Sequence, residues 1–251
     1  MPTPLLELRN IGKIYVSEGN VAVGIRGVNL SFDRGEFVAV TGKSGSGKST
    51  LLNVLSGMDT YEEGELLICG EPTSHYLQSD WEEYRKQYIS FIFQEYNIIE
   101  SFTVLQNVEL ALMNISDRRA RRARALELLR RVGLEKFIHH KGSKLSGGQK
   151  QRTVIARALA KDSPIILADE PVAALDPVTA KQVMQDFVHI NQEMGISILL
   201  NIHHVELALE YADRIIGIRA GKIVYDGPSA KVDQAVLDSI YGEQAGAEEC
   251  V

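Results

Sequence analysis

A glycine-rich segment near the start of the chain has the residue types needed to bind phosphate. Residues 42–49 read Gly-Lys-Ser-Gly-Ser-Gly-Lys-Ser and fit the pattern G-x-x-x-x-G-K-[ST], between the apolar run 37–40 and an apolar helical stretch. Backbone N–H groups of such a loop point at phosphate oxygens, its lysine reaches the phosphates, and the hydroxyl after that lysine binds Mg²⁺. The predicted phosphate-binding residues are Gly42, Lys43, Ser44, Gly45, Ser46, Gly47, Lys48, Ser49 and Thr50.

Two adjacent carboxylates follow a second apolar run. Residues 165–168 are apolar and lead directly into Asp169 and Glu170. A buried strand would bring Asp169 to the carboxyl edge of a sheet, where it could hold the hydration shell of Mg²⁺. Glu170 would then orient and polarise an attacking water. Taken alone, the pair could also be a solvated strand end, but the phosphate-binding loop favours the catalytic interpretation.

The remaining sequence predicts elements that would position these residues. Alternating or continuous apolar runs predict strands within 5–40 and at 165–168, 196–202 and 215–218, and residues 60–93 look strand-like and rich in turns. Helical patterns occupy about 104–132, 177–194 and 204–211. Strands that alternate with helices predict an α/β fold with a mostly parallel sheet covered by helices.

Composition narrows the classes of function. The chain has 251 residues, 45% of them hydrophobic, and a formal net charge of -6, which argues against a nucleic-acid-binding protein. Two cysteines, Cys69 and Cys250, make no disulfide framework or metal motif, and they fit a reducing cytosolic compartment. The N-terminus has no secretory pattern, and no apolar run approaches the roughly 20 residues of a membrane span. We therefore expect any role at a membrane to come through a partner.

A serine-glycine-glycine-glutamine segment identifies a family resemblance. Residues 145–149 read Leu-Ser-Gly-Gly-Gln and open a helix, which is a second potential anion site. The segment resembles the signature sequence of the ATPases of ATP-binding cassette (ABC) transporters, and the resemblance extends over about residues 5–242 with the motifs in family order. In that family the signature loop of one subunit caps the γ-phosphate bound to the other. The resemblance adds Ser146, Gly147, Gly148 and Gln149 to the nucleotide-binding residues.

The resemblance also implies a fold and a division of the chain. It implies a P-loop NTPase (RecA-like) core with an antiparallel β subdomain and an inserted α-helical subdomain, in a single ABC ATPase domain over residues 1–251. The expected parts are a β subdomain with the P-loop core (1–93), a helical subdomain with the signature (94–150), completion of the core (151–242) and a tail (243–251).

Further site residues are implied one by one. Tyr15 is similar to the aromatic residue that stacks on adenine, and its alternative is a tyrosine on a strand surface. Gln94 resembles the glutamine that contacts Mg²⁺ and water, so the implied metal-binding residues are Ser49, Gln94 and Asp169. His203 matches the histidine that contacts the γ-phosphate, whereas His204 fits a surface histidine better. In the dimer-contact loop Ala174 stands where the family usually has serine.

The implied reaction is ATP + H₂O → ADP + phosphate, with ATP and Mg²⁺ as cofactors. Glu170, His203, Lys48 and Gln94 are the implied catalytic residues, and their task is to position groups and stabilise charge. The implied partners are integral-membrane permease subunits and a second ATPase subunit, which makes a homodimer around two MgATP molecules. The expected location is cytoplasmic and peripheral, at the inner face of the cell membrane.

Two transporter classes compete. Residues up to about 150 resemble ATPases of macrolide-exporter and lipoprotein-release systems, and residues from about 153 resemble phosphonate-importer ATPases. We expect the exporter class, because the permease contact implied by the resemblance lies in the first half. Import is the alternative, and a non-transport ABC ATPase acting on DNA or ribosomes is a weaker one, since the chain lacks the long insertions of such proteins.

An arginine-rich helical stretch has two interpretations. Its basic residues suggest either a patch that faces lipid or nucleic acid, or an ordinary solvated helix face. We favour the solvated face, because Asp117 and Glu127 are close by and the chain is acidic overall. The cluster is Arg118, Arg119, Arg121, Arg122 and Arg124.

Overall fold

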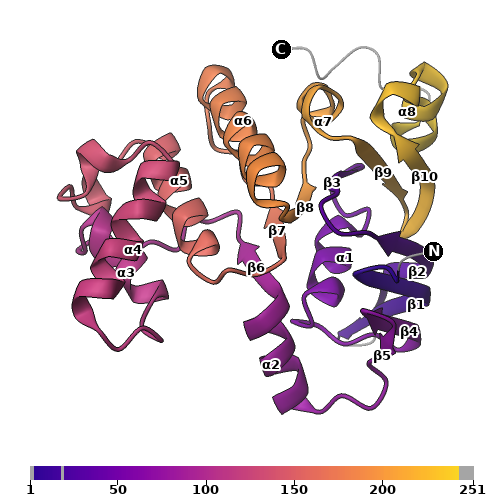
Figure 1. The fold of residues 1–251 in the computed structure, drawn as a ribbon. Helices are drawn as coiled ribbons and strands as arrows, with labels where there is room; N and C mark the ends of the chain where they lie inside the picture. The colour runs from indigo at the N-terminus through magenta and orange to yellow at the C-terminus, as the bar shows by residue number, and fades with distance from the viewer. Residues whose placement is uncertain (1–2, 18–19, 243–251) are drawn as a thin grey trace.

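The computed structural model describes residues 3–17 and 20–242, so the expected tail 243–251 and Cys250 lie outside the described residues. Within those residues six strands form one sheet, in which β9, β3, β8, β7 and β6 run parallel and β10 is an antiparallel edge strand (Figure 1). In sheet order these strands are β10 (Lys222–Pro228), β9 (Arg214–Arg219), β3 (Phe37–Thr41), β8 (Ser197–Asn201), β7 (Ile165–Asp169) and β6 (Ile89–Ile92).

The centre of this sheet is apolar on both faces because each face has its own core. Along β3, Phe37 and Ala39 pack into one cluster of buried side chains, whereas Val38 and Val40 pack into the other. Successive side chains of a strand point to opposite faces, so a strand buried on both sides must be continuously hydrophobic. The mostly parallel sheet expected from the sequence is therefore present.

A second, antiparallel sheet covers one face of the first. Its order is β2-β1-β4-β5, and helix α1 (Lys48–Leu55) packs between the two sheets, as Figure 1 shows. Leu51, Leu52 and Leu55 of α1 are fully buried there. The strands of the second sheet are β1 (Leu6–Ser17), β2 (Asn20–Phe32), β4 (Glu63–Ile68) and β5 (Glu71–Pro72).

One helix lies where the sequence suggested only strands and turns. Helix α2 (Gln78–Tyr88) begins after Leu77, whose N–H donates to the Asp80 carboxylate at 2.7 Å. Its aromatic residues recur at helical spacing, and Tyr84 is buried and donates its hydroxyl to the Leu55 carbonyl at 2.6 Å. The prediction of strands and turns was wrong for this stretch, because the aromatic side chains form one helical face against α1.

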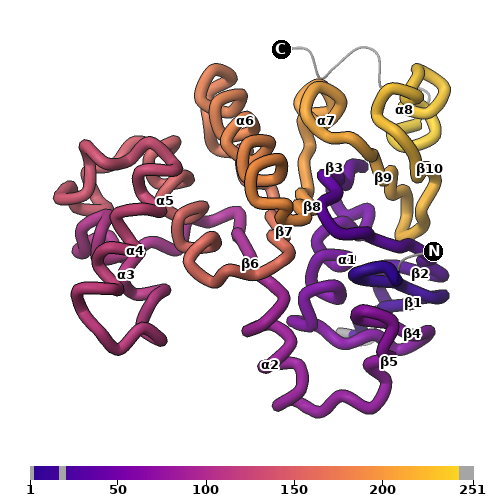
Figure 2. Tube along the Cα trace, viewed as in Figure 1, coloured from indigo at the N-terminus to yellow at the C-terminus, as the bar shows by residue number. Residues whose placement is uncertain are grey.

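Helices α6, α7 and α8 pack against strands of the main sheet. Helices α3, α4 and α5 form a group set apart from the two sheets, and the trace enters it after β6 and leaves it through α5 (Figure 2). The boundary expected at residue 150 falls inside α5, so the division into subdomains stays a proposal. The helices are α3 (Val104–Ala111), α4 (Arg118–Arg131), α5 (Gly147–Leu159), α6 (Pro177–Met194), α7 (Val205–Tyr211) and α8 (Gln234–Tyr241), with short 3-10 turns η1 (Glu135–Phe137), η2 (Gly142–Lys144) and η3 (Ser229–Lys231).

The helical pattern over 104–132 is two helices, because the Asp117 carboxylate caps a new N-terminus by accepting from the Arg119 and Ala120 N–H groups. On α4, Arg124 pairs with Glu127 at 2.9 Å and with Asp162 at 2.7 Å. These contacts agree with the solvated helix face.

Among the described residues, none of the helices has both the length and the apolar character needed to cross a membrane.

Replacing Phe187 by alanine tests the importance of the core beneath α6. Its side chain is 0% exposed in the larger core, so Phe187→Ala should lower the free energy of unfolding by about 3–5 kcal/mol. The matched control is Val178→Ala, on the same helix but 68% exposed, which should change it by at most about 0.5 kcal/mol. Urea unfolding followed by circular dichroism measures both, and equal effects would contradict this packing.

Candidate nucleotide-binding site

The glycine-rich loop joins β3 to α1 in a conformation that requires glycine. Gly47, the residue before α1, has a φ of 109°, which L side chains rarely adopt. A Cβ atom there would lie 2.2 Å from the carbonyl oxygen of Gly24 on β2. The loop therefore packs directly against the backbone of the second sheet. Its N–H groups and the N-terminus of α1 are suited to bind an anionic ligand.

Lys48 holds a positive charge at the base of this loop. Its side chain is nearly buried, with the residue 5% exposed, and the ammonium donates to the carbonyls of Gly42 at 2.8 Å and Lys43 at 3.1 Å. Burial lowers the pKa of Lys48, whereas the nearby charges of Glu170 and Asp169 act to raise it. An anion brought to the loop would satisfy this desolvated ammonium.

Two of the three metal-binding residues expected from the sequence, Ser49 and Asp169, are in contact. The Ser49 hydroxyl donates to Asp169 Oδ1 at 3.3 Å, across the gap between α1 and the end of β7. Asn201, at the end of β8, donates its amide N–H to the same Asp169 oxygen at 2.7 Å. A hydroxyl and a carboxylate side by side are a donor set that suits Mg²⁺, so the residues present fit this ion.

Glu170 and His203 are in contact with each other beside the glycine-rich loop. Nε2 of His203 lies 2.5 Å from Oε1 of Glu170, and both side chains border the same cavity as Lys48. The Glu170 backbone has a φ of 49°, an uncommon conformation for a residue with a side chain, and its N–H donates to the Asn201 carbonyl at 3.0 Å. His204, by contrast, is exposed at the start of α7.

These residues border a cavity of ≈ 270 Å³ between the loop and β1–β2. A volume of this size at a glycine-rich loop suits a phosphorylated small molecule. Ala22, Val23 and Gly24 on β2 line the cavity and were not expected from the sequence. Of the predicted residues, the lining contains Tyr15, Ser44, Gly45, Gly47, Lys48, Ser49, Thr50, Glu170 and His203.

A charged network holds the tyrosine at the mouth of the cavity. The Tyr15 hydroxyl donates to Asp59 at 2.8 Å, and Lys13 pairs with Asp59 at 3.0 Å and with Glu62 at 2.9 Å. The Lys13 ammonium also lies 5.3 Å from the centre of the Tyr15 ring. Burial raises the pKa of Tyr15, so its hydroxyl stays protonated as a donor. Sequence reasoning missed Lys13 and Asp59, because the contact joins β1 to a turn far along the chain.

Other predicted residues lie outside the cavity lining. Gln94 is exposed after β6 at the edge of the sheet. Ser146 caps α5, where its hydroxyl accepts from the Gln149 N–H at 3.3 Å and its own N–H donates to the Gln149 side chain at 3.0 Å. A Cβ at Gly148 would lie 2.4 Å from a methyl of Thr179, so the signature segment packs against the start of α6. Lys43 contributes its carbonyl to Lys48, and Ser46 is buried within the loop.

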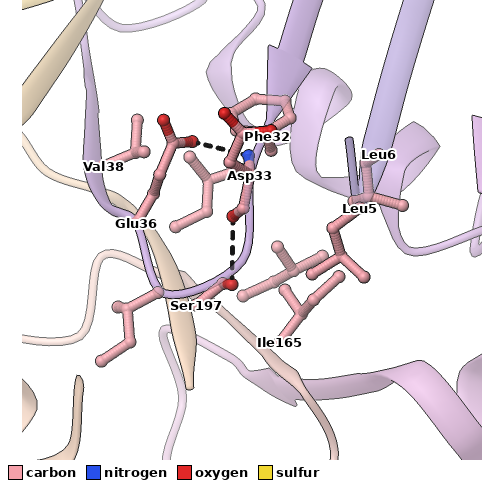
Figure 3. A pocket seen from close by; sticks show the side chains of 11 residues that line it. Leu5, Leu6, Phe32, Asp33, Glu36, Val38, Ile165 and Ser197 are labelled. Carbon is pink, nitrogen blue, oxygen red and sulfur yellow. Dashed lines mark hydrogen bonds between the residues drawn. The ribbon is translucent and has the colours of Figure 1, made fainter. Parts of the chain in front are cut away.

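A second hollow lies at the opposite edge of the main sheet. Figure 3 shows it among Leu5, Phe32, Val38 and Ile165, with the Ser197 hydroxyl donating to the Asp33 carbonyl at 3.3 Å. Its volume is ≈ 10 Å³, about the room that one water needs. This hollow is therefore a packing feature at the amino ends of the strands and not a ligand site.

Alanine at two loop glycines separates steric from conformational effects. Gly47→Ala places a methyl against the Gly24 carbonyl, whereas Gly45→Ala, also at positive φ, meets nothing within 4 Å. Strain of about 1–2 kcal/mol is common to both variants, so Gly45→Ala should weaken ATP binding about thirtyfold or less and Gly47→Ala by more. Isothermal titration calorimetry measures both affinities. An unchanged affinity of Gly47→Ala would contradict the site.

Comparison with known proteins supports the family. The family model "ABC transporter" matches residues 25–173. The "Phosphonates import ATP-binding protein PhnC" of Lactococcus lactis subsp. cremoris (strain SK11) is 45% identical over 249 residues, covering 96% of this chain and 100% of that protein. The protein of the same name from Staphylococcus aureus (strain USA300) is 41% identical over 257 residues, covering 97% of each.

Solved structures agree with the fold. The dimeric, post-hydrolysis ATP-binding cassette MJ0796 bound to ADP and Pi matches with a TM-score of 0.81 and 38% identity, over 89% of this chain and 98% of that one. The cbiO1 protein from Clostridium perfringens, part of the ABC transporter complex cbiONQ, matches with a TM-score of 0.84 and 26% identity, over 94% and 93%. The expected P-loop NTPase fold is confirmed. The chain belongs to the ABC transporter family, as an ATP-binding subunit that hydrolyses ATP.

Proposed function

We propose that this chain binds MgATP at the loop 42–49, hydrolyses it in a dimer of two copies, and so powers import of a phosphonate-class solute through a membrane permease. The observation that supports ATP hydrolysis most directly is the convergence of Lys48, Glu170 and His203 on one cavity. The cavity combines a phosphate-binding loop with a carboxylate, which are the two parts that phosphoryl transfer to water needs.

The proposed roles follow from the contacts. The loop N–H groups and the Lys48 ammonium bind the phosphates and neutralise charge that develops on them. Glu170 accepts a hydrogen bond from the attacking water and orients it toward the γ-phosphate. His203, in contact with Glu170 Oε1, fixes that carboxylate and faces the γ-phosphate end of the cavity. Tyr15, held by Asp59, provides the surface on which adenine stacks.

Mg²⁺ is proposed to be held by Ser49 and Asp169, with Gln94 as a further ligand. When bound, the ion supplies positive charge that neutralises the phosphate oxygens. The Ser49 hydroxyl and the Asp169 carboxylate already lie within hydrogen-bonding distance of each other, so little rearrangement is needed to bind one cation between them.

A second copy is proposed to complete each site. Within one chain Ser146 and the start of α5 lie outside the cavity lining, although a helix N-terminus suits an anion. The cassette MJ0796, to which this chain is similar, is described as dimeric. We therefore assign residues 146–149 to the γ-phosphate bound by the partner copy. Ala174, exposed in the loop before α6, offers no hydroxyl for contacts between the copies.

Import is favoured over the exporter class that the first half of the sequence suggested. Relatives named for phosphonate import are 41–45% identical to this chain in alignments that cover 96–97% of it, so these alignments are not confined to residues after 153. Their extent along the chain supports the import alternative. A permease partner would then hold the chain at the inner face of the cell membrane.

Replacing Glu170 by glutamine tests the catalytic assignment. Glu170→Gln keeps the shape of the side chain but cannot take up a proton, so ATP hydrolysis should fall by about 10²–10⁴-fold while ATP affinity stays near that of the wild type. The variant should also accumulate as an ATP-dependent dimer, measured by analytical ultracentrifugation. Glu193→Gln, an exposed position at the end of α6, is the matched control. Turnover within about threefold of the wild type would remove Glu170 from this role.

Identification of the membrane partner tests the direction of transport. Tagged Glu170→Gln should be purified with MgATP from detergent-solubilised membranes of the source organism, and co-purifying proteins identified by mass spectrometry. We expect a permease with many spans together with a solute-binding protein. A permease with few spans and a large extracytoplasmic domain would instead support export. Lys48→Ala, which should not bind ATP tightly, is the control for capture that depends on the closed dimer.

A further inference from the structure

The end of strand β8 carries an amide at a position that favours hydrocarbon. Asn201 is 0% exposed and lies in the sheet between Val40 of β3 and Asp169 of β7. The residues before it on β8 are buried and mostly aliphatic. Burying an amide costs free energy unless its donors and acceptors are paired. A buried amide at this position therefore has to be stabilised by specific hydrogen bonds.

Asn201 contacts both acidic residues of the site, Asp169 through its side chain and Glu170 through its main chain. Its Nδ2 donates to Asp169 Oδ1 at 2.7 Å and lies 3.4 Å from the Ser49 hydroxyl oxygen. Its main-chain carbonyl accepts the N–H of Glu170 at 3.0 Å. Only the amide nitrogen could lie so close to a carboxylate oxygen, because two acceptors would repel each other. The contact with Glu170 is made by the main chain, so the contact that depends on an asparagine side chain is the one that orients Asp169.

In the described part of the chain, the oxygen of the same amide is unpaired. Asn201 Oδ1 is buried and has no hydrogen-bond partner among residues 3–17 and 20–242. An unpaired buried acceptor costs free energy. The amide is therefore present at a cost to stability, and its role lies in the contact of Nδ2 with Asp169.

A second buried asparagine has hydrogen-bond partners of a different kind. Asn191, 8% exposed on α6, donates to the carbonyls of Gly35 and Ile196, both at 2.9 Å. Its partners are backbone groups that join α6 to the loops around β8 and β3. Asn191 is therefore structural, whereas the partners of Asn201 are the proposed metal-binding residues.

We propose that Asn201 is a positioning residue for Mg²⁺: its amide N–H donates to Asp169 and orients that carboxylate toward the ion. This inference rests on the proposed Mg²⁺ role of Ser49 and Asp169 and assigns a residue that holds them. An aspartate in its place would add a third carboxylate beside Asp169 and Glu170, and an aliphatic residue would leave Asp169 Oδ1 with the Ser49 hydroxyl alone.

The test measures metal binding apart from turnover. Full-length wild type, Asn201→Leu and Asn191→Leu are compared for ATP affinity in EDTA, for the free Mg²⁺ concentration that gives half of the metal effect on ATP binding, and for Mn²⁺ binding by electron paramagnetic resonance. For Asn201→Leu we expect unchanged ATP affinity in EDTA and a metal midpoint raised about 10- to 100-fold, which is usual when a residue that orients a metal ligand is lost. Asn191→Leu should lower the melting temperature and leave the metal midpoint unchanged.

Other outcomes are distinguishable. A metal midpoint of Asn201→Leu within about twofold of the wild type would overturn the proposal, as would equal losses in EDTA and in Mg²⁺. If Asn201→Leu does not fold, Asn201→Ser replaces it, since its shorter side chain cannot span the 2.7 Å contact and should raise the midpoint in the same direction. If the wild type itself shows no metal effect, or Asp169→Asn does not shift it, the proposed Mg²⁺ site fails rather than the role of Asn201.

Discussion

The parallel register of β3, β8 and β7 is the constraint on which the site depends. Parallel strands end at a common edge, and their ends here deliver the glycine-rich loop, Asn201 and Asp169 side by side. Each strand is buried on both faces, so a slip in register would exchange the side chains packed in the two cores and would also separate the charged groups. The same core packing that stabilises the sheet thus sets the distances on which the chemistry depends.

Charge is balanced across this edge. The Lys48 ammonium is desolvated, and the two adjacent acids partly compensate by favouring its charged form. A phosphate chain brings negative charge toward the ammonium, and a cation brings positive charge toward the acids, so nucleotide and metal are favoured together more than either alone. The N-terminus of α5 lies outside the lining of this cavity, which is why a second copy is proposed to complete the site.

Local motifs were predictable, and contacts between distant strands were not. The loop 42–49 and the pair Asp169–Glu170 follow from short patterns that each contain their own strand or helix signal. Asn201 and Lys13 escaped notice because their roles depend on which strand or turn lies beside them. Helix α2 was missed because its aromatic residues resemble those of strands. His203 could be named only through the family resemblance, and its contact with Glu170 emerges from the fold.

Gly24 links the two halves of the cavity. Its carbonyl oxygen limits the approach of Gly47, and a Cβ on Gly24 would lie 2.9 Å from the Tyr15 ring and 2.8 Å from the Thr50 methyl. The tyrosine, the start of α1 and the phosphate loop therefore rest on one bare stretch of backbone. In the proposed binding mode their separation sets the distance between the base stacked on Tyr15 and the phosphates. A larger residue at position 24 would displace the Tyr15 ring and Thr50 together, and so would disturb both ends of the bound nucleotide at once.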